Sequence, residues 1–299
     1  HAINAQEEEI HFTSGATESI NLALKGAFFN YGHEKPHIIT VRTEHKAVLD
    51  TCAYLEEIGG EVTYLTVNSE GLINLDELRN NIRKDTLLIS VMTANNETGV
   101  LQDIKTIGEI CKSSDVLFFT DATQAYGKVP IDVLEASIDM LCFSAHKIYG
   151  PKGIGGLFVR KGIKLTPQIH GGGHEFGLRS GTLNVPGIVG LAKATQLCLE
   201  EMEDTYWKVK KIRDDFESEL EKTGKIKVNG RNAPRLPHFS NFQLKNEEAE
   251  SFILRNRNKI AVAQGSACNS ALVQPSHVLK AMGLGDREAE NSIRVSIGE

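Results

Sequence analysis

Hydrophobic residues follow two alternating patterns through the first half of the chain. Short apolar runs alternate with longer stretches in which apolar residues recur every three or four positions. The first pattern is typical of buried strands, and the second is typical of helices that pack one face on a sheet. Strands are expected at 10–13, 38–41, 62–67, 87–92 and 116–120, and helices at 20–28, 46–58, 75–82 and 104–111. This alternation predicts an α/β fold with a mostly parallel central sheet.

A long helical pattern marks a change of organisation in the second half. Apolar residues keep helical spacing from about 188 to 220, beyond the roughly 25 residues usual for one globular helix. We interpret this stretch as the passage into a second domain. Strands are expected after it at 226–228, 239–242, 260–262 and 292–296, with a helix at 249–254. The prediction is a large domain over 1–200 and a smaller C-terminal α+β domain over 201–299.

Polar residues gather where four predicted strands end. The clusters lie at 43–46, 95–99, 121–124 and 144–147. Any one of them is also compatible with turn formation or helix capping. The carboxyl ends of parallel strands meet at one edge of a sheet, where ligands collect. Four clusters together therefore favour a binding site at that edge.

Two glycine-containing segments have the composition of anion sites. Residues 14–19 open a helix, whose free N–H groups and dipole suit a phosphate. A simple N-cap without a ligand is the alternative. Residues 171–184 contain three consecutive glycines together with Arg179 and Thr182, which would allow an anion contact. The alternative there is a flexible connector.

Lys147 is the first candidate for covalent chemistry, because apolar runs flank it on both sides. Burial disfavours the charged ammonium, and a neutral lysine amine attacks aldehydes. A surface lysine in a turn is the alternative. Cys268 is the second candidate, because small polar neighbours would leave its thiol accessible. The other four cysteines lie in helical or strand patterns and are expected to be buried. Arg294 lies on the polar side of a predicted strand, where it would bind a carboxylate or form a surface salt bridge.

Composition excludes several classes of protein. The 299 residues carry a net charge of −6, which argues against nucleic-acid binding. No apolar run approaches the roughly 20 residues of a membrane span, and no signal peptide opens the sequence. The five cysteines form no CxxC pair, so neither a zinc knuckle nor a disulfide framework is indicated. A reducing, cytoplasmic location is expected.

Eight segments together resemble one enzyme family. They are FTSGATES (12–19), EHKAVLD (44–50), NNETGVLQDI (95–104), DATQAYGKVPID (121–132), SAHKIYGPKG (144–153), GGGHEFGLRSGTLN (171–184), GSACNS (265–270) and SIRVSIG (292–298). The chain resembles, over essentially its whole length, the cysteine desulfurases of the IscS/NifS group. These are pyridoxal-phosphate enzymes of the class-V aminotransferase family and of fold type I. GSACNS, in place of an Arg-x-Gly-His-x-Cys pattern, favours this group over the SufS and selenocysteine-lyase group.

The resemblance assigns four chemical roles. Lys147 would form the Schiff base with the cofactor and later carry protons. Asp121 would keep the pyridine nitrogen protonated, so that the ring can accept electrons. His45 would stack on the ring and act in acid–base steps. Cys268 would accept the substrate sulfur as a persulfide.

The resemblance also implies binding residues and partners. Further cofactor contacts would come from Ala16, Thr17, Asn96, Gln124, Ser144 and His146. Thr182 would reach the phosphate of the neighbouring subunit, which implies a homodimer. Arg294, with Asn96, would bind the substrate carboxylate. The implied activity converts L-cysteine to L-alanine and passes sulfur to an acceptor protein for iron–sulfur cluster assembly or another thiolation pathway.

Other functions remain open at this point. The chain would alternatively be a related pyridoxal-phosphate lyase or aminotransferase, against which Cys268 argues. A non-catalytic sulfur-pathway scaffold is a third possibility, against which intact Lys147, Asp121, His45 and Cys268 argue. No metal site is expected, because one thiol cannot complete one; Cys268 would make at most a transient contact with an iron–sulfur cluster.

The sequence departs from the family pattern in two respects. Ala145 stands where the family usually has glycine, and its methyl is expected to crowd the phosphate turn. The family pattern also has segments before FTSGATES and after SIRVSIG that this sequence lacks. We therefore expect it to be the ordered or expressed part of a longer protein.

Overall fold

The computed structural model describes residues 2–264 and 275–298, so the predicted GSACNS segment with Cys268 lies outside the described residues. The chain divides into two compact units. The first comprises His1–Leu65, Leu75–Thr93 and Gln102–Met202. The second comprises Thr66–Asn74, Ala94–Leu101 and Glu203–Glu299, so it includes two short segments from the front half of the chain.

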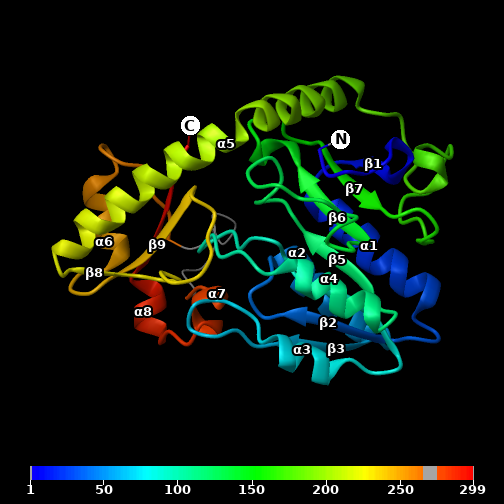
Figure 1. Ribbon diagram of the computed structural model, residues 1–299, viewed down its shortest axis with the longest axis horizontal. Coiled ribbons are helices and arrows are strands. Elements are labelled where there is room, and N and C mark those ends of the chain that lie inside the picture. The colour runs from blue at the N-terminus through cyan, green and yellow to red at the C-terminus, as the bar shows by residue number, and fades with distance from the viewer. Residues whose placement is uncertain (1, 265–274, 299) are drawn as a thin grey trace. The chain divides into compact units, whose positions relative to one another are not determined.

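The first unit is built on a seven-stranded sheet (Figure 1), which confirms the predicted α/β class. Its strands are β1 (Ile10–Thr13), β2 (His37–Val41), β3 (Glu61–Leu65), β4 (Thr86–Ser90), β5 (Leu117–Asp121), β6 (Met140–Ser144) and β7 (Gly155–Val159). They lie in the order β1-β7-β6-β5-β4-β2-β3. The pairs from β3 to β6 are parallel, and β7 is antiparallel to both β6 and β1. Strands β2, β4, β5 and β6 are buried along nearly their whole length, which explains their continuous apolar runs.

Helices join these strands. They are α1 (Ala16–Tyr31), α2 (Lys46–Glu57), α3 (Leu75–Asn81) and α4 (Ile104–Ser113), and the first part of α5 (Val185–Lys222) follows the last strand of this sheet, β7. Short 3-10 turns occur at η1 (Glu7–Glu9), η2 (Ala145–Lys147) and η3 (Glu175–Gly177). In α4, Ile107 and Ile110 are buried, as their helical spacing predicts, and the Asp103 side chain accepts a hydrogen bond from the Thr106 N–H at 3.1 Å. That cap fixes where α4 begins.

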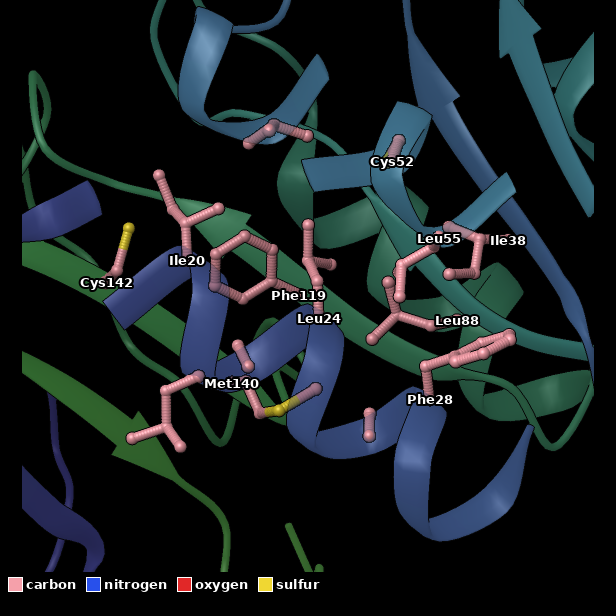
Figure 2. Close-up of a cluster of buried hydrophobic side chains, with 14 of the residues drawn as sticks. Ile20, Leu24, Phe28, Ile38, Cys52, Leu55, Leu88, Phe119, Met140 and Cys142 are labelled. Carbon is pink, nitrogen blue, oxygen red and sulfur yellow. The ribbon is translucent and has the colours of Figure 1, made fainter. Parts of the chain in front are cut away.

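Helix α1 supplies one side of a large core cluster of the first unit. Figure 2 shows Ile20, Leu24 and Phe28 of this helix with Phe119 of β5 and Met140 of β6 in that cluster. Residues spaced by four along a helix share one face, so the sequence spacing directly determines this contact. Burial of each such side chain contributes about 1.5–3 kcal/mol. The cluster holds the beginning of α1 against the sheet edge where β5 and β6 end.

Helix α5 is continuous over 38 residues, as the long helical pattern predicts. The boundary between the two units falls within it, after Met202. No helix among the described residues combines the length and hydropathy that crossing a membrane requires.

The second unit contains an antiparallel sheet of three strands in the order β10-β9-β8. Its elements are β8 (Ile226–Val228), β9 (Phe239–Leu244), α6 (Ala249–Asn256), α7 (His277–Ala281), α8 (Asp286–Glu290) and β10 (Ser292–Ser296). The strands predicted near 226, 239 and 292 are confirmed. Val228, Phe242 and Ile293 form its core, against which Phe216 and Leu220 of α5 pack.

The strand predicted at 260–262 is wrong. The Ile260 N–H donates to the Asn256 carbonyl at 3.0 Å, which completes a turn after α6. The side chain of Ile260 is 45% exposed, so it contributes little to a core. Strand-like pairing begins only at Ala263, which forms an isolated bridge with Arg294 of β10.

Candidate active site

Three side chains singled out in the sequence follow parallel strands of the large sheet. His45 caps α2 shortly after β2, Asp121 ends β5 and Ser144 ends β6. Because β2, β4, β5 and β6 run in parallel, their carboxyl ends lie at the same edge. The topology therefore places these polar groups at the edge where an α/β sheet binds ligands.

Asp121 is a buried carboxylate, with 5% of its surface exposed. Its Oδ1 accepts hydrogen bonds from the Thr123 N–H at 2.8 Å and from the Cys142 Sγ at 3.4 Å. Cys142 lies directly opposite Asp121 in the β5–β6 pairing. Two donors on one oxygen fix the plane of the carboxylate, which suits a group that must face a protonated nitrogen.

Glu44 is fully buried and lies close enough to Asp121 for their charges to interact. Burial, and then the charge of Asp121, raise the pKa of Glu44 well above its usual value. Its Oε1 accepts a hydrogen bond from the Met92 N–H at 2.6 Å. A protonated Glu44 would add no second negative charge near the Asp121 carboxylate.

His45 caps helix α2 with its imidazole ring. Its Nδ1 accepts a hydrogen bond from the Ala47 N–H at 3.1 Å and thereby caps α2. In the neutral ring, this bond places the proton on Nε2. The helix cap therefore sets both the tautomer and the orientation of the imidazole.

The start of α1 has the form of a phosphate cradle. Gly15 is its N-cap residue, with φ of 149°, in a region that favours glycine. A Cβ added to Gly15 would lie 3.6 Å from the Ser144 Oγ, so the hydroxyl faces this turn closely. Ser144 Oγ also pairs with the His146 Nδ1 at 2.9 Å. Ala16 and Thr17 are the first two residues of the helix.

Arg179, an expected anion contact, is engaged elsewhere. Its Nε donates to the Glu18 Oε1 at 2.7 Å. Glu18 Oε2 also accepts a hydrogen bond from the Ser14 N–H at 2.7 Å. Arg179 therefore pairs with an acidic side chain of the chain itself, and its contact with a ligand anion stays a prediction. The guanidinium neutralises an acidic side chain in the first turn of α1, which would otherwise repel a phosphate.

Lys147 and Gln124 follow β6 and β5, the strands that end at Ser144 and Asp121. Lys147 ends the 3-10 turn that follows β6, and it is half-buried rather than enclosed. Gln124 lies three residues after Asp121 and is 8% exposed. Burial, and then the charges of Lys147 and Lys152, lower the pKa of His146, which favours the neutral imidazole beside Ser144. Thr182 is exposed, as expected for a residue proposed to act on another subunit.

Ala145 is fully buried, and its methyl faces a different part of the turn from the one expected. A Cβ added to Gly150 would lie 3.0 Å from the Ala145 Cβ, whereas a Cβ added to Gly15 would meet the Ser144 Oγ and not Ala145. We therefore predict that Ala145→Gly leaves the affinity for pyridoxal phosphate unchanged. It should lower the free energy of unfolding by about 1 kcal/mol, through the lost methyl and the added backbone freedom. Cofactor titration and urea unfolding measure the two quantities, and clearly tighter cofactor binding would show that the methyl crowds the phosphate.

Two further predicted residues meet in the second unit. The Arg294 Nη1 donates to the backbone carbonyl of Asn96 at 3.1 Å, across nearly two hundred positions of sequence. Arg294 lies on β10 and is half-buried, and Asn96 is 9% exposed. Both belong to the unit that contains residues 94–101 and 203–299.

One residue that holds Asp121 was not predicted as part of the site: Cys142 was expected only to be buried. Thr123, which also holds Asp121, and Glu44 lie in the polar clusters predicted at 121–124 and 43–46. The register of β5 against β6 identifies Cys142, and no sequence pattern gives that register. Cys52, Cys111 and Cys142 are buried, as expected, while Cys198 is partly exposed.

The residues of the first unit fit pyridoxal phosphate. Asp121 offers a buried carboxylate for the ring nitrogen, and the Gly15 turn leaves room beside Ser144 at a helix N-terminus for a phosphate. Lys147 follows Ser144 by three residues and provides an amine for the aldehyde. His45 adds an aromatic ring at the same sheet edge.

Comparison with known proteins agrees with this chemistry. The aminotransferase class-V family matches residues 1–299. A curated relative from Neisseria meningitidis serogroup A, named cysteine desulfurase IscS, is 51% identical over 298 residues, which cover 99% of this chain and 74% of the relative. A solved NifS-like protein is similar with a TM-score of 0.90 and 38% identity, covering 99% of this chain and 79% of that one. A structure described as SspA in complex with cysteine has a TM-score of 0.83 and 40% identity, covering 99% and 83%.

Proposed function

The chain belongs to the aminotransferase class-V family, and from this premise we propose that it is a pyridoxal-phosphate-dependent cysteine desulfurase. The observation that carries the proposal is the set of groups at one sheet edge. Asp121, His45, Ser144 and Lys147 supply an anion, an aromatic ring, a phosphate ligand and an amine there. Relatives named for this activity match over nearly the whole chain.

The cofactor would be held by residues of the first unit. Asp121 would face the ring nitrogen, His45 the ring, and Gln124 the ring oxygen. The phosphate would lie against Ala16, Thr17, Ser144 and His146. When bound, pyridoxal phosphate supplies an electron sink that stabilises negative charge at the substrate Cα. The buried, doubly hydrogen-bonded Asp121 supports this role by favouring a protonated ring nitrogen.

The substrate would be recognised through its carboxylate. Arg294 is always charged, and its planar guanidinium matches a carboxylate with paired hydrogen bonds. Its contact with the Asn96 carbonyl holds the guanidinium beside the second residue proposed to bind substrate. The pair would bind the carboxylate of L-cysteine, and the Lys147 amine would remove the Cα proton and later return it.

The sulfur would pass to Cys268. The thiolate of Cys268 attacks the substrate sulfur, so an S–S bond forms as the Cβ–S bond breaks. The electron pair of the broken bond stays with the substrate carbon, which takes a proton and leaves as L-alanine. The enzyme is left with a persulfide on Cys268, and a thiol acceptor then removes the outer sulfur.

A homodimer would complete the cofactor site through Thr182. The surface of the first unit carries large exposed apolar side chains, which include Tyr149 (68%), Phe176 (76%), Val185 (58%) and Val189 (62%). Exposed apolar groups of this size favour an interface. Contact with a second copy through this surface would bury them and bring Thr182 to the phosphate of that copy.

The sulfur acceptor would be a protein of iron–sulfur cluster assembly or of another thiolation pathway. Two relatives carry the name cysteine desulfurase IscS, and a structural neighbour is described as DndA from Streptomyces lividans. We place the protein in the cytoplasm, because a reducing compartment keeps a persulfide-forming thiol available.

A stoichiometric assay tests the proposed function. The purified protein loaded with pyridoxal phosphate should be yellow and should release sulfide and alanine in equal amounts from L-cysteine and dithiothreitol. L-Alanine and L-serine, which lack the sulfur, should give no sulfide and serve as controls. Pyruvate in place of alanine would indicate a lyase, and transfer of the amino group to a keto acid would indicate an aminotransferase; either result would refute the proposal.

A further inference from the structure

The turn that carries Asn96 is tightly organised by its own side chains. The Asn95 Oδ1 accepts hydrogen bonds from the Glu97 N–H at 2.9 Å and from the Thr98 N–H at 3.0 Å. All the residues of this turn are buried. The turn is therefore rigid within itself, and its position depends on what holds it from outside.

Strands β9 and β10 hold the turn through its backbone. The Asn241 Nδ2 donates to the Glu97 carbonyl at 3.3 Å, and the Arg294 Nη1 donates to the Asn96 carbonyl at 3.1 Å. Asn241 and Arg294 are paired across the two strands. Two successive carbonyls of the turn are thus bound by two paired residues of the sheet, so a shift of the turn alters the Arg294 contact directly.

Helix α7 holds the same turn through the Glu97 side chain. The Glu97 Oε2 accepts a hydrogen bond from the Ser276 Oγ at 2.5 Å. Ser276 is the N-cap of α7, and its Oγ also accepts a hydrogen bond from the Leu279 N–H at 3.2 Å. Glu97 is 2% exposed and Ser276 is 9% exposed. A hydrogen bond to a carboxylate is about twice as strong as a neutral one, and burial strengthens it further.

Burial of the Glu97 carboxylate costs desolvation free energy. An apolar side chain of similar size would avoid this cost, so packing alone does not explain why residue 97 is a glutamate. Glu97 follows Asn96 in the sequence. The Asn96 carbonyl that accepts the hydrogen bond from Arg294 belongs to the peptide group that joins Asn96 to Glu97. The Glu97–Ser276 bond is therefore well placed to determine where the Asn96–Arg294 pair lies.

We propose that Glu97 is a positioning residue for substrate recognition: its bond to Ser276 sets the Asn96–Arg294 pair in the arrangement that binds the carboxylate of the amino-acid substrate. This inference rests on the proposed function, which assigns substrate binding to that pair. Glu97 itself contacts neither substrate nor cofactor in this account. Displacement of a binding group by about 1 Å costs up to about 100-fold in efficiency, so a modest shift of the turn has a measurable effect.

Two variants of Ser276 with almost equal shape distinguish the effect of losing the Glu97–Ser276 hydrogen bond from the effect of losing the helix cap. Aspartate and asparagine both cap helices about as well as serine does. Ser276→Asn keeps a donor for Glu97, whereas Ser276→Asp removes it and places a second carboxylate there. We expect Ser276→Asp to raise the KM for L-cysteine about tenfold, with a smaller change in kcat, and Ser276→Asn to stay close to the parent.

Recovery of the KM in a double variant would identify Glu97 as the hydrogen-bond partner of residue 276. In the double variant Glu97→Gln with Ser276→Asp, the glutamine amide donates to the aspartate, so the KM should return to within about threefold of the parent. Equilibrium binding of L-alanine to the holoenzyme, measured by calorimetry, should weaken and recover in parallel. Glu250→Gln removes an exposed carboxylate of the second unit and is the control, with an unchanged KM.

The outcomes distinguish this inference from the proposed function. A parent enzyme that releases no sulfide from L-cysteine refutes the proposed function. An active parent whose Ser276→Asp variant keeps the parental KM, or loses only thermal stability and kcat, refutes the positioning role. If Ser276→Asp does not fold, Glu97→Gln alone replaces it with an expected KM rise of about threefold, and an unchanged KM would overturn the proposal.

Discussion

We expect Cys268→Ala to release no sulfide from L-cysteine while it keeps the yellow colour of bound pyridoxal phosphate. The proposed cofactor groups Asp121, Ser144 and Lys147 belong to the first unit and are unchanged in this variant. The substrate sulfur, however, loses the nucleophile that accepts it. Loss of a covalent nucleophile should lower the rate by at least about 10³-fold, which corresponds to about 4 kcal/mol of transition-state stabilisation.

Cys198→Ala is the matched control for this experiment. Cys198 is a partly exposed thiol of the first unit, and its Sγ donates a hydrogen bond to the Ile148 carbonyl at 3.8 Å. This variant should keep the parental rate of sulfide release. Labelling with a thiol reagent after addition of L-cysteine should detect a persulfide in the parent and in Cys198→Ala only. Sulfide release by Cys268→Ala at the parental rate would show that another group accepts the sulfur.

Lys147→Ala should lose both turnover and the absorption band of the lysine-bound cofactor. The amine is proposed to bind the cofactor aldehyde and to move the Cα proton of the substrate. Removal of the group that transfers this proton alone should lower the rate by about 10²- to 10⁴-fold. Spectra recorded before and after borohydride treatment, together with sulfide assays, measure the two effects separately.

Lys152 provides the control for the loss of a lysine. It is exposed, it lies in the same Gly/Pro-containing turn, and its charge acts on His146 as that of Lys147 does. Lys152→Ala should keep the absorption band and the rate. If Lys147→Ala retained a borohydride-sensitive band, a different lysine would be the one that holds the cofactor, and the proposed assignment would be wrong.

Most strands and helices of the first unit could be predicted from the sequence. Strands β2, β4 and β5 are short apolar runs, and α1, α2 and α4 have regular apolar spacing. These signals are local, because a buried strand needs apolar side chains on both faces and a packed helix needs them on one. The strand at 260–262 was predicted wrongly because three apolar residues also fit a turn that closes a helix.

Strand order and register could not be predicted in the same way. The sequence does not show that β7 returns antiparallel between β6 and β1, or that Cys142 lies opposite Asp121. Nor does it show that residues 66–74 and 94–101 belong with the C-terminal unit. Pairing of this kind depends on how distant surfaces fit together, and local composition carries little information about that fit.

The sequence by itself determined the chemical groups that this protein carries: a lysine after a buried strand, an aspartate at the end of another, a glycine-led helix start and a cysteine among small polar residues. Residue type and short-range spacing determine these features. Only the tertiary structure decided which oxygen of Asp121 is bound, that Arg179 neutralises Glu18, and that Glu97 connects the Asn96 turn to α7. The contacts made by Cys142, Arg179 and Glu97 join atoms far apart in the chain, which come within hydrogen-bond distance only after folding.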